Sequence, residues 1–302
     1  MKKNKLMKSL FFFLFFPLVI FSQSNEPFIK VDKNFIDNLE GVDDVVNEEL
    51  SLNTYRERFD FLNANTFLNI EYNEVNYAYV KKYLSYRWYG KIIGLSSYYF
   101  PLFENKLAQY GMPKELKYLA VVESALNPRA GSWAGAKGLF QFMPATGNQY
   151  GLKGNSYVNT FYDPVANTDC AVRYLRDLYK RFGDWNLAIS AYNCGEGNVQ
   201  KAINKAGSKN YWKVRPFLPR ETQAYVPSFI AVNYLFNFYK EHNFKPMYFK
   251  FSFSDLKVIR VNENTTFEQL GNDYNYRILK FANPQFLSNV IPKGSIVYVY
   301  DK

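Results

Sequence analysis

The sequence has few side chains that bind transition metals. Cys170, Cys194 and His242 are the only thiol and imidazole groups in its 302 residues. A zinc site needs about four such ligands at short, regular spacings, so we expect no metal, and no cofactor is indicated either. The two cysteines can form one disulfide if their Cα atoms come within about 7 Å, or they can remain two buried thiols. The sequence leaves both alternatives open.

Long hydrophobic runs are also missing. The apolar run Leu10–Phe21 covers about 12 residues, whereas a membrane-spanning helix needs roughly 20. Four lysines precede the run and small or polar residues follow it at positions 22–24. This pattern predicts a secretory signal peptide over residues 1–22 and export to the periplasm or cell envelope. An uncleaved N-terminal anchor is the alternative. Because no cysteine follows the run directly, the usual acylation site of a bacterial lipoprotein is absent.

Acidic residues are fewer than basic ones, but the excess is modest. The chain has 37 Lys and Arg against 27 Asp and Glu, a net charge of +10. Without residues 1–22 the numbers become 33 and 27, or +6. This excess suits an anionic polymer or simple solubility, and does not by itself indicate nucleic acid. With 48% apolar residues the chain can form a core, and its length suggests two domains or one domain with an appendage.

The middle of the chain has a helical pattern. Residues 23–85 are polar at first and predict an N-terminal arm that is helical or loosely ordered, and residues 86–243 predict one helical domain. Stop signals divide that domain into helices. The expected helices are 101–110, 113–124, a helix capped by Asp163 that ends at Gly183, one capped by Asp184 that ends at Gly195, and a last one from about Arg220 to Tyr239.

The end of the chain has a different pattern. Residues 256–261 and 295–300 are strand-like, and two short helical stretches, 266–274 and 276–281, lie between them. This predicts a small βααβ module at 256–302, joined by a linker at 244–255 that contains Pro246. The predicted fold class is therefore mainly α with a small α+β module at the C-terminus.

Glu123 is the first candidate for chemistry. It follows the apolar stretch 119–122 at the end of a predicted helix, just before Asn127 and Pro128 turn the chain. Burial of a carboxyl favours its protonated form, which a general acid needs. Taken alone, a partly exposed glutamate at a helix end is the more ordinary interpretation.

Two further stretches contain residues that suit sugars. A loop of small residues at 131–138 includes Ser132, and L-F-Q-F-M-P-A-T follows with Gln141 and Met143. Glycines let a backbone approach a ligand closely, and hydroxyl and amide groups suit sugar hydroxyls and N-acetyl groups. Residues 191–197 read A-Y-N-C-G-E-G, with Tyr192 near a helix end. Simple core packing is the alternative for Met143 and for Tyr192.

Four ordered strings resemble the lytic transglycosylases of glycoside hydrolase family 23. They are E-S-A-L-N-P (123–128), G-A-K-G-L-F-Q-F-M-P-A-T-G (135–147), A-Y-N-C-G-E-G-N-V (191–199) and P-R-E-T-Q-A-Y-V-P (219–227). The likeness covers roughly residues 98–237, nearly half of the chain. It implies that residues 86–243 form a goose-lysozyme-like catalytic domain of helices.

The resemblance also implies a role for each matching residue. Glu123 would be the sole catalytic acid and base, and Tyr192 would help to hold it and the charged sugar intermediate. The substrate-binding residues implied are Ser132, Gln141, Met143, Tyr192, Asn193 and Glu221. Two other carboxylates come under consideration as a second catalytic group, but we interpret Glu196 as a solvated loop acid and Asp163 as a helix cap.

The implied reaction cleaves the bond between N-acetylmuramic acid and N-acetylglucosamine in peptidoglycan without water and leaves 1,6-anhydro ends. Such an enzyme is a lyase, and its partner is the glycan strand, with no nucleic acid. Two alternatives remain, a non-catalytic peptidoglycan-binding protein and a hydrolytic muramidase.

The C-terminal module resembles a LysM domain, which binds glycans that contain N-acetylglucosamine. The matching residues are Asn283, Pro284 and the stretch 291–294. The glycine and aspartate that usually follow the first strand are replaced by residues 262–266, N-E-N-T-T. Glycan binding and a purely structural role are both open for this module.

Overall fold

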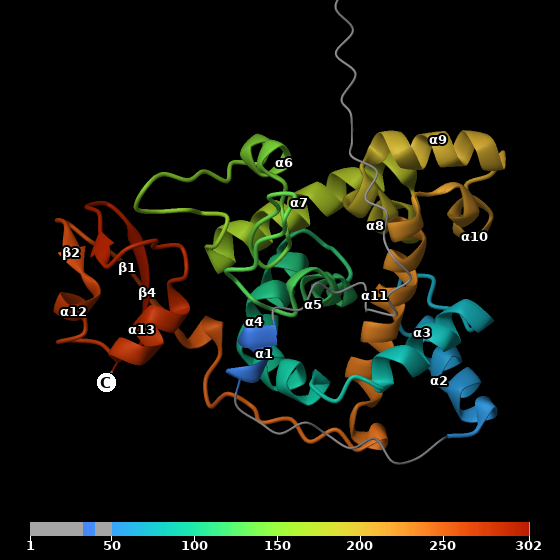
Figure 1. Ribbon diagram of the computed structural model, residues 1–302, viewed down its shortest axis with the longest axis horizontal. Helices are drawn as coiled ribbons and strands as arrows, with labels where there is room; N and C mark the ends of the chain where they lie inside the picture. The colour runs from blue at the N-terminus through green and yellow to red at the C-terminus, as the bar shows by residue number, and fades with distance from the viewer. Residues whose placement is uncertain (1–32, 40–49, 302) are drawn as a thin grey trace, which may run out of the picture.

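The computed structural model describes residues 33–39 and 50–301 (Figure 1). The predicted signal peptide and part of the N-terminal arm lie outside these residues. Within the two described ranges, none of the helices combines the length and the apolar character that crossing a bilayer requires.

Helices make up most of the described chain, as the sequence predicted. The α-helices before the C-terminal module are α1 (Lys33–Asp37), α2 (Leu52–Ala64), α3 (Glu74–Leu84), α4 (Tyr89–Gln109), α5 (Tyr118–Ser124), α6 (Pro144–Gln149), α7 (Pro164–Phe182), α8 (Trp185–Cys194), α9 (Glu196–Ala206), α10 (Tyr211–Val214) and α11 (Arg220–Phe238). Short 3-10 helices are η1 (Lys114–Lys117), η2 (Arg215–Phe217), η3 (Lys240–His242) and η4 (Phe253–Asp255).

Local signals place α7 and α8 where the sequence predicted them. The Asp163 side chain accepts hydrogen bonds from the backbone N–H groups of the first turn of α7, and Gly183 ends the helix with a φ of 69°. Asp184 then caps α8 by accepting from the N–H of Leu187. Caps of this kind satisfy donors that a helix end leaves unpaired, so they fix where each helix begins.

Helix α4 is longer than the sequence predicted. It begins at Tyr89 instead of residue 101, and Pro101 lies inside it. An internal proline costs about 3 kcal/mol because it removes a hydrogen bond and crowds the preceding turn. Ile92, Leu95 and Tyr99 are almost fully buried on this helix. Since each such side chain contributes about 1.5 to 3 kcal/mol on burial, packing outweighs the proline.

The described part of the N-terminal arm belongs to the main hydrophobic core. Helix α3 packs along α11, and both lie beside α2 in Figure 1. Tyr55 and Phe59 of α2 are fully buried. Their rings lie 5.7 and 5.6 Å from the ring of Tyr234 on α11. Residues 50–84 therefore help to hold α11, which carries part of the site described below.

The single histidine is part of this packing. Arg58 donates hydrogen bonds from Nη1 to the hydroxyl of Tyr234 at 3.0 Å and to Nε2 of His242 at 2.9 Å. His242 is buried, and its pKa is lowered to about 4, first by burial and then by the charge of Arg58. Since Nε2 accepts the proton of Arg58, the imidazole is neutral in the folded protein.

Acid should destabilise the protein through His242. The pKa is about 4 when folded and 6.5 when unfolded. Stability is therefore full above pH 6.5 and falls as the pH is lowered toward 4, because the unfolded chain then binds the extra proton. Between pH 7 and 4.5 this loss should be roughly 2 to 3 kcal/mol. Urea unfolding at both pH values checks it. His242→Gln should remove this contribution to the loss of stability. If the variant lost as much stability between pH 7 and 4.5 as the wild type, His242 would not be the group responsible.

The C-terminal module has the predicted order of elements. Strand β1 (Lys257–Arg260) pairs antiparallel with β4 (Ile296–Val299), and helices α12 (Phe267–Leu270) and α13 (Tyr276–Ala282) lie between them. Two short strands that the sequence did not predict, β2 (Thr265–Thr266) and β3 (Val290–Ile291), form a second antiparallel pair. The module has a small core of its own, made of Val261, Phe267, Leu279, Phe286, Ile291, Val297 and Val299.

Residues 244–255 run from the helical domain to the module and pack against α4. Tyr98 of α4 contacts the rings of Phe249, Phe251 and Phe253, with centroids 5.6 to 5.8 Å apart. The backbone approaches α4 so closely that a Cβ on Gly94 would lie 2.2 Å from the carbonyl oxygen of Met247. Figure 1 shows the segment crossing the domain to the module. It is therefore a packed part of the fold.

Candidate active site

Glu123 lies in the last turn of α5 and is half-buried. The chain leaves the helix through two left-handed residues, Ala125 with a φ of 51° and Leu126 with a φ of 65°. Non-glycine residues in this region cost about 1 to 2 kcal/mol each, so the turn needs support. The buried hydroxyl of Ser124 provides some, because it bonds the carbonyl oxygen of Leu139 at 2.8 Å. This contact joins the helix end to the glycine-rich loop.

Tyr225 contacts Glu123. The tyrosine lies on α11, is fully buried, and donates a hydrogen bond from its hydroxyl to Oε1 of Glu123. Burial, and after it the charge of Glu123, raise the pKa of Tyr225 well above its usual range. The phenol therefore stays protonated and remains a donor. Tyr225 was not among the residues predicted for the site, although it lies within the P-R-E-T-Q-A-Y-V-P string.

Tyr192 lies nearby, but its hydroxyl has a different partner. It donates to the carbonyl oxygen of Phe140 at 2.7 Å. Burial raises the pKa of Tyr192 well above its usual range, with the charge of Glu123 as the next cause. The ring packs against Phe142 and Tyr174. The structure thus brings Tyr192 to the site and uses its hydroxyl to hold the loop.

Three predicted site residues lie in or next to the glycine-rich loop, and their side chains have different surroundings. Ser132 accepts a hydrogen bond at Oγ from the N–H of Ala136, which closes the loop. Gln141 has a φ of 48° and donates from Nε2 to the carbonyl oxygens of Ala130 and Gly138. Met143 is 44% exposed just before α6, so it is not a core residue. Ser132 and Gln141 therefore shape the loop, and Met143 presents an apolar surface beside it.

The last two predicted residues lie near the start of α11. Asn193 accepts a hydrogen bond at Oδ1 from the hydroxyl of Thr222 at 2.6 Å, which ties α8 to α11. Glu221 is exposed in the first turn of α11. Its charge is among the causes that raise the pKa of Tyr225.

The other two candidate carboxylates have structural partners. Asp163 caps α7, as predicted, and also accepts a hydrogen bond from the hydroxyl of Tyr298 at 3.0 Å. Glu196 is the first residue of α9 and forms an ion pair with Arg181. Glu196 was predicted to lie in a loop, and the structure instead has it as the first residue of α9.

The two cysteines are free thiols in the structure, so the disulfide alternative does not describe it. Cys170 is fully buried, and burial raises the pKa of its thiol to about 12. Cys194 is half-buried at the end of α8. Among the residues that the structure describes, no three Cys, His, Asp or Glu side chains gather into a group that could hold a metal ion.

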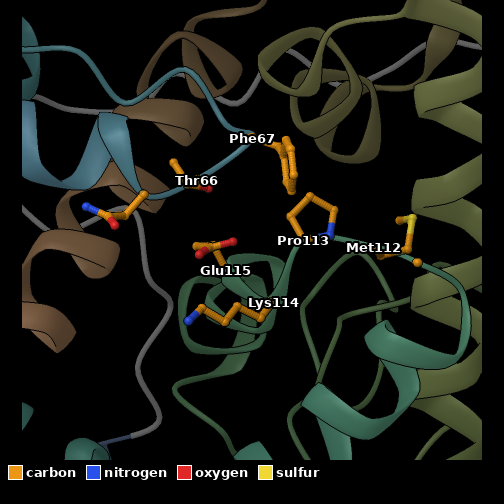
Figure 2. Close-up of a pocket in the computed structure, with 8 residues that line it drawn as sticks. Thr66, Phe67, Met112, Pro113, Lys114 and Glu115 are labelled. Atoms are coloured by element: carbon orange, nitrogen blue, oxygen red, sulfur yellow. The ribbon is translucent and has the colours of Figure 1, made fainter.

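A cavity of about 300 Å³ lies elsewhere, between the segment that follows α2 and the connection from α4 to η1. Figure 2 shows Phe67 next to Pro113 there, with Lys114 and Glu115 further along the chain. Its lining residues are Asn65, Thr66, Phe67, Gly111, Met112, Pro113, Lys114 and Glu115, and no predicted site residue is among them.

The central part of the chain is similar to known proteins. Residues 100–215 match the family model described as the Transglycosylase SLT domain. The chain is 43% identical over 134 residues to the membrane-bound lytic murein transglycosylase D of Escherichia coli K12, covering 43% of this chain and 29% of that protein. It is 32% identical over 153 residues to the soluble lytic murein transglycosylase of the same strain, covering 46% and 24%. The chain therefore spans less than a third of the length of these relatives.

Among solved structures, the 70 kDa soluble lytic transglycosylase of Escherichia coli aligns with a TM-score of 0.43 and 22% identity, covering 58% of this chain and 31% of that one. The fold and the site define a helical domain built around one partly buried carboxyl with a buried phenol as its partner. Residues 100–215 match the transglycosylase SLT domain, and over part of its length the chain is similar to the lytic murein transglycosylases.

Proposed function

We propose that the protein is a peptidoglycan lytic transglycosylase, which cleaves the N-acetylmuramic acid–N-acetylglucosamine bond without water and leaves 1,6-anhydro ends. The observation that supports this most is the hydrogen bond from the buried Tyr225 to Glu123. This bond supports a role for Glu123 as proton carrier, because it gives the carboxyl a neutral donor on one oxygen at the helix end that precedes the glycine-rich loop. Asp163 and Glu196 are engaged as a helix cap and in an ion pair, which argues against the two-carboxylate arrangement of ordinary glycosidases.

In this mechanism Glu123 moves one proton twice. Because Tyr225 engages Oε1, the transferred proton belongs on Oε2. Glu123 donates it to the glycosidic oxygen as the bond from that oxygen to C1 breaks. The carboxylate then takes the proton of the C6 hydroxyl of the same sugar, whose oxygen attacks C1 and closes the anhydro ring. A tethered nucleophile of this kind can lower the barrier by several kcal/mol, about 7 to 11 in the best cases.

The remaining predicted residues would bind the glycan. Met143 is exposed beside the glycine-rich loop, and so is Trp133, which was not predicted, within the loop; such side chains pack well against sugar rings. Asn193 lies at the end of α8 and Glu221 at the start of α11. We place the protein in the periplasm or cell envelope, where its substrate lies. For the C-terminal module we propose a structural role, supported by its contacts with the helical domain.

Digestion of purified peptidoglycan tests the proposal. Ends formed without water are about 18 Da lighter than hydrolysed ends, so mass spectrometry of the released muropeptides distinguishes the reactions. We expect anhydro ends. Hydrolysed ends would indicate a muramidase, and intact strands that pellet with the protein would indicate a binding protein. Either result would contradict the proposed activity.

A further inference from the structure

The C-terminal module contacts the loop that follows Glu123. Arg129 comes directly after the E-S-A-L-N-P string, and its guanidinium reaches into the module. Nε donates to the carbonyl oxygen of Pro284 at 3.0 Å, and Nη2 donates to that of Phe286 at 2.7 Å. Both acceptors lie in a buried stretch of the module. A buried carbonyl without a donor costs about 1 to 3 kcal/mol, so these two bonds stabilise the contact.

The same stretch is fixed by the helical domain on another side. Residues 157–159 run antiparallel to residues 285–287 and form a bridge between Val158 and Phe286. The N–H of Asn159 donates to the carbonyl oxygen of Gln285 at 2.9 Å, and the N–H of Leu287 donates to that of Tyr157 at 2.9 Å. Together with the bond from Tyr298 to Asp163, these contacts hold the module still relative to α7. The carbonyl groups that Arg129 bonds therefore belong to a stretch whose position is already fixed by other contacts.

On the other side, Arg129 is connected to the site. Its N–H donates to Oδ1 of the buried Asn127 at 2.9 Å. The next residue, Ala130, accepts hydrogen bonds at its carbonyl oxygen from the N–H of Gly138 and from Nε2 of Gln141. The short segment 125–132 thus links Glu123 to Ser132, and it starts with two left-handed residues that would relax if they were not restrained.

We propose that Arg129 is a positioning residue, which holds segment 125–132 in its active conformation by anchoring it to the C-terminal module. The module then belongs to the active unit instead of being an independent binding attachment. This inference rests on the proposed function, because it concerns the geometry of the same site.

Arg129→Gln tests the proposal in the full chain, because the shorter amide does not reach both carbonyls. On a soluble, uncross-linked glycan fragment we expect kcat to fall about tenfold or more with KM within about threefold, since segment 125–132 would reach its active conformation less often. Arg129→Lys retains one donor and should give an intermediate kcat. Arg260→Gln is the matched control, because Arg260 also donates to a backbone carbonyl, that of Gly294 at 2.7 Å, but within the module. It should keep wild-type kcat.

A spectroscopic measurement separates positioning from general stability. The chain has four tryptophans, and Trp133 is 86% exposed in the glycine-rich loop. In protein labelled with fluorotryptophan, Arg129→Gln should shift the fluorine signal of Trp133, assigned with Trp133→Phe, and leave the other three in place. If this variant does not fold, Arg129→Lys is measured instead.

Several results would overturn the role of Arg129. These are a kcat within about twofold of wild type, a loss in KM alone, an unchanged Trp133 signal, or a shift of all four signals. Failure of the proposed function is distinguishable, because wild-type protein would then release no anhydro ends while the fluorine spectra would still report the coupling between Arg129 and the loop.

Discussion

Glu123→Gln should lower turnover by about a thousandfold or more, because general acid and base catalysis each contribute roughly 10² to 10⁴ and one carboxyl performs both steps here. Glutamine has nearly the same shape, and its amide oxygen can still accept the hydrogen bond from Tyr225. The fold and the binding of peptidoglycan should therefore be retained. The measurement is the rate at which anhydro-ended muropeptides appear, together with the melting temperature and the fraction of protein that pellets with peptidoglycan.

Glu196→Gln is the matched control for this experiment. It makes the same chemical change at the start of α9, where the carboxylate forms an ion pair with Arg181. Exposed pairs of this kind contribute about 1 kcal/mol or less, so activity should be unchanged. If Glu123→Gln kept most of its activity, or if Glu196→Gln lost as much, Glu123 would not be the proton carrier.

Tyr225→Phe should give the second largest effect, a fall in kcat of about 10 to 100-fold. The variant keeps the buried ring and removes only the hydroxyl that donates to Oε1 of Glu123. A buried hydrogen bond to a charged group is worth about 1.5 to 3 kcal/mol, and its loss removes a contact that orients the carboxyl toward the scissile bond. The kinetics on a soluble glycan fragment measure this, and KM should change much less than kcat.

Tyr192→Phe provides the comparison, since it removes a hydroxyl that bonds the backbone at Phe140. Its effect should be about tenfold smaller than that of Tyr225→Phe, because the bond from Tyr225 to the carboxyl remains. The sequence assigned the phenol role to Tyr192. A larger loss for Tyr192→Phe than for Tyr225→Phe would restore that assignment and contradict the structure.

Helix ends that depend on a few neighbouring residues were predicted correctly. Asp163, Gly183 and Asp184 act within one helical turn of their own positions, so the sequence alone placed both ends of α7 and the start of α8. The order of elements in the C-terminal module was predicted for the same reason. The start of α4 was missed, because the burial that keeps Pro101 inside that helix comes from packing against distant segments.

The partner of Glu123 was missed because the two residues are 102 positions apart. A signal was nevertheless present. Glu221 and Tyr225 are four residues apart in a predicted helix, so they share one face of it. A residue four positions after one already assigned to the site was therefore a candidate for the same site.

The segment 244–255 was predicted to be a linker, and its packing against α4 followed from a pattern that was not used. Phe249, Phe251 and Phe253 alternate with polar residues, which is the pattern of an extended chain with one buried face. The sequence did not show which surface would cover that face. It is the ring of Tyr98, more than 150 residues earlier in the chain for each of the three.

The missing side chain of Gly94 allows residues 244–255 to pack directly on α4. Where the hydrogen on its Cα stands, even a methyl group would collide with the peptide of Met247. A relative with alanine at this point would have to move the crossing segment away from the helix, while the contacts of Arg129 and of residues 157–159 would still hold the C-terminal module. The route of the connecting segment over α4 thus depends on the smallest side chain in the protein.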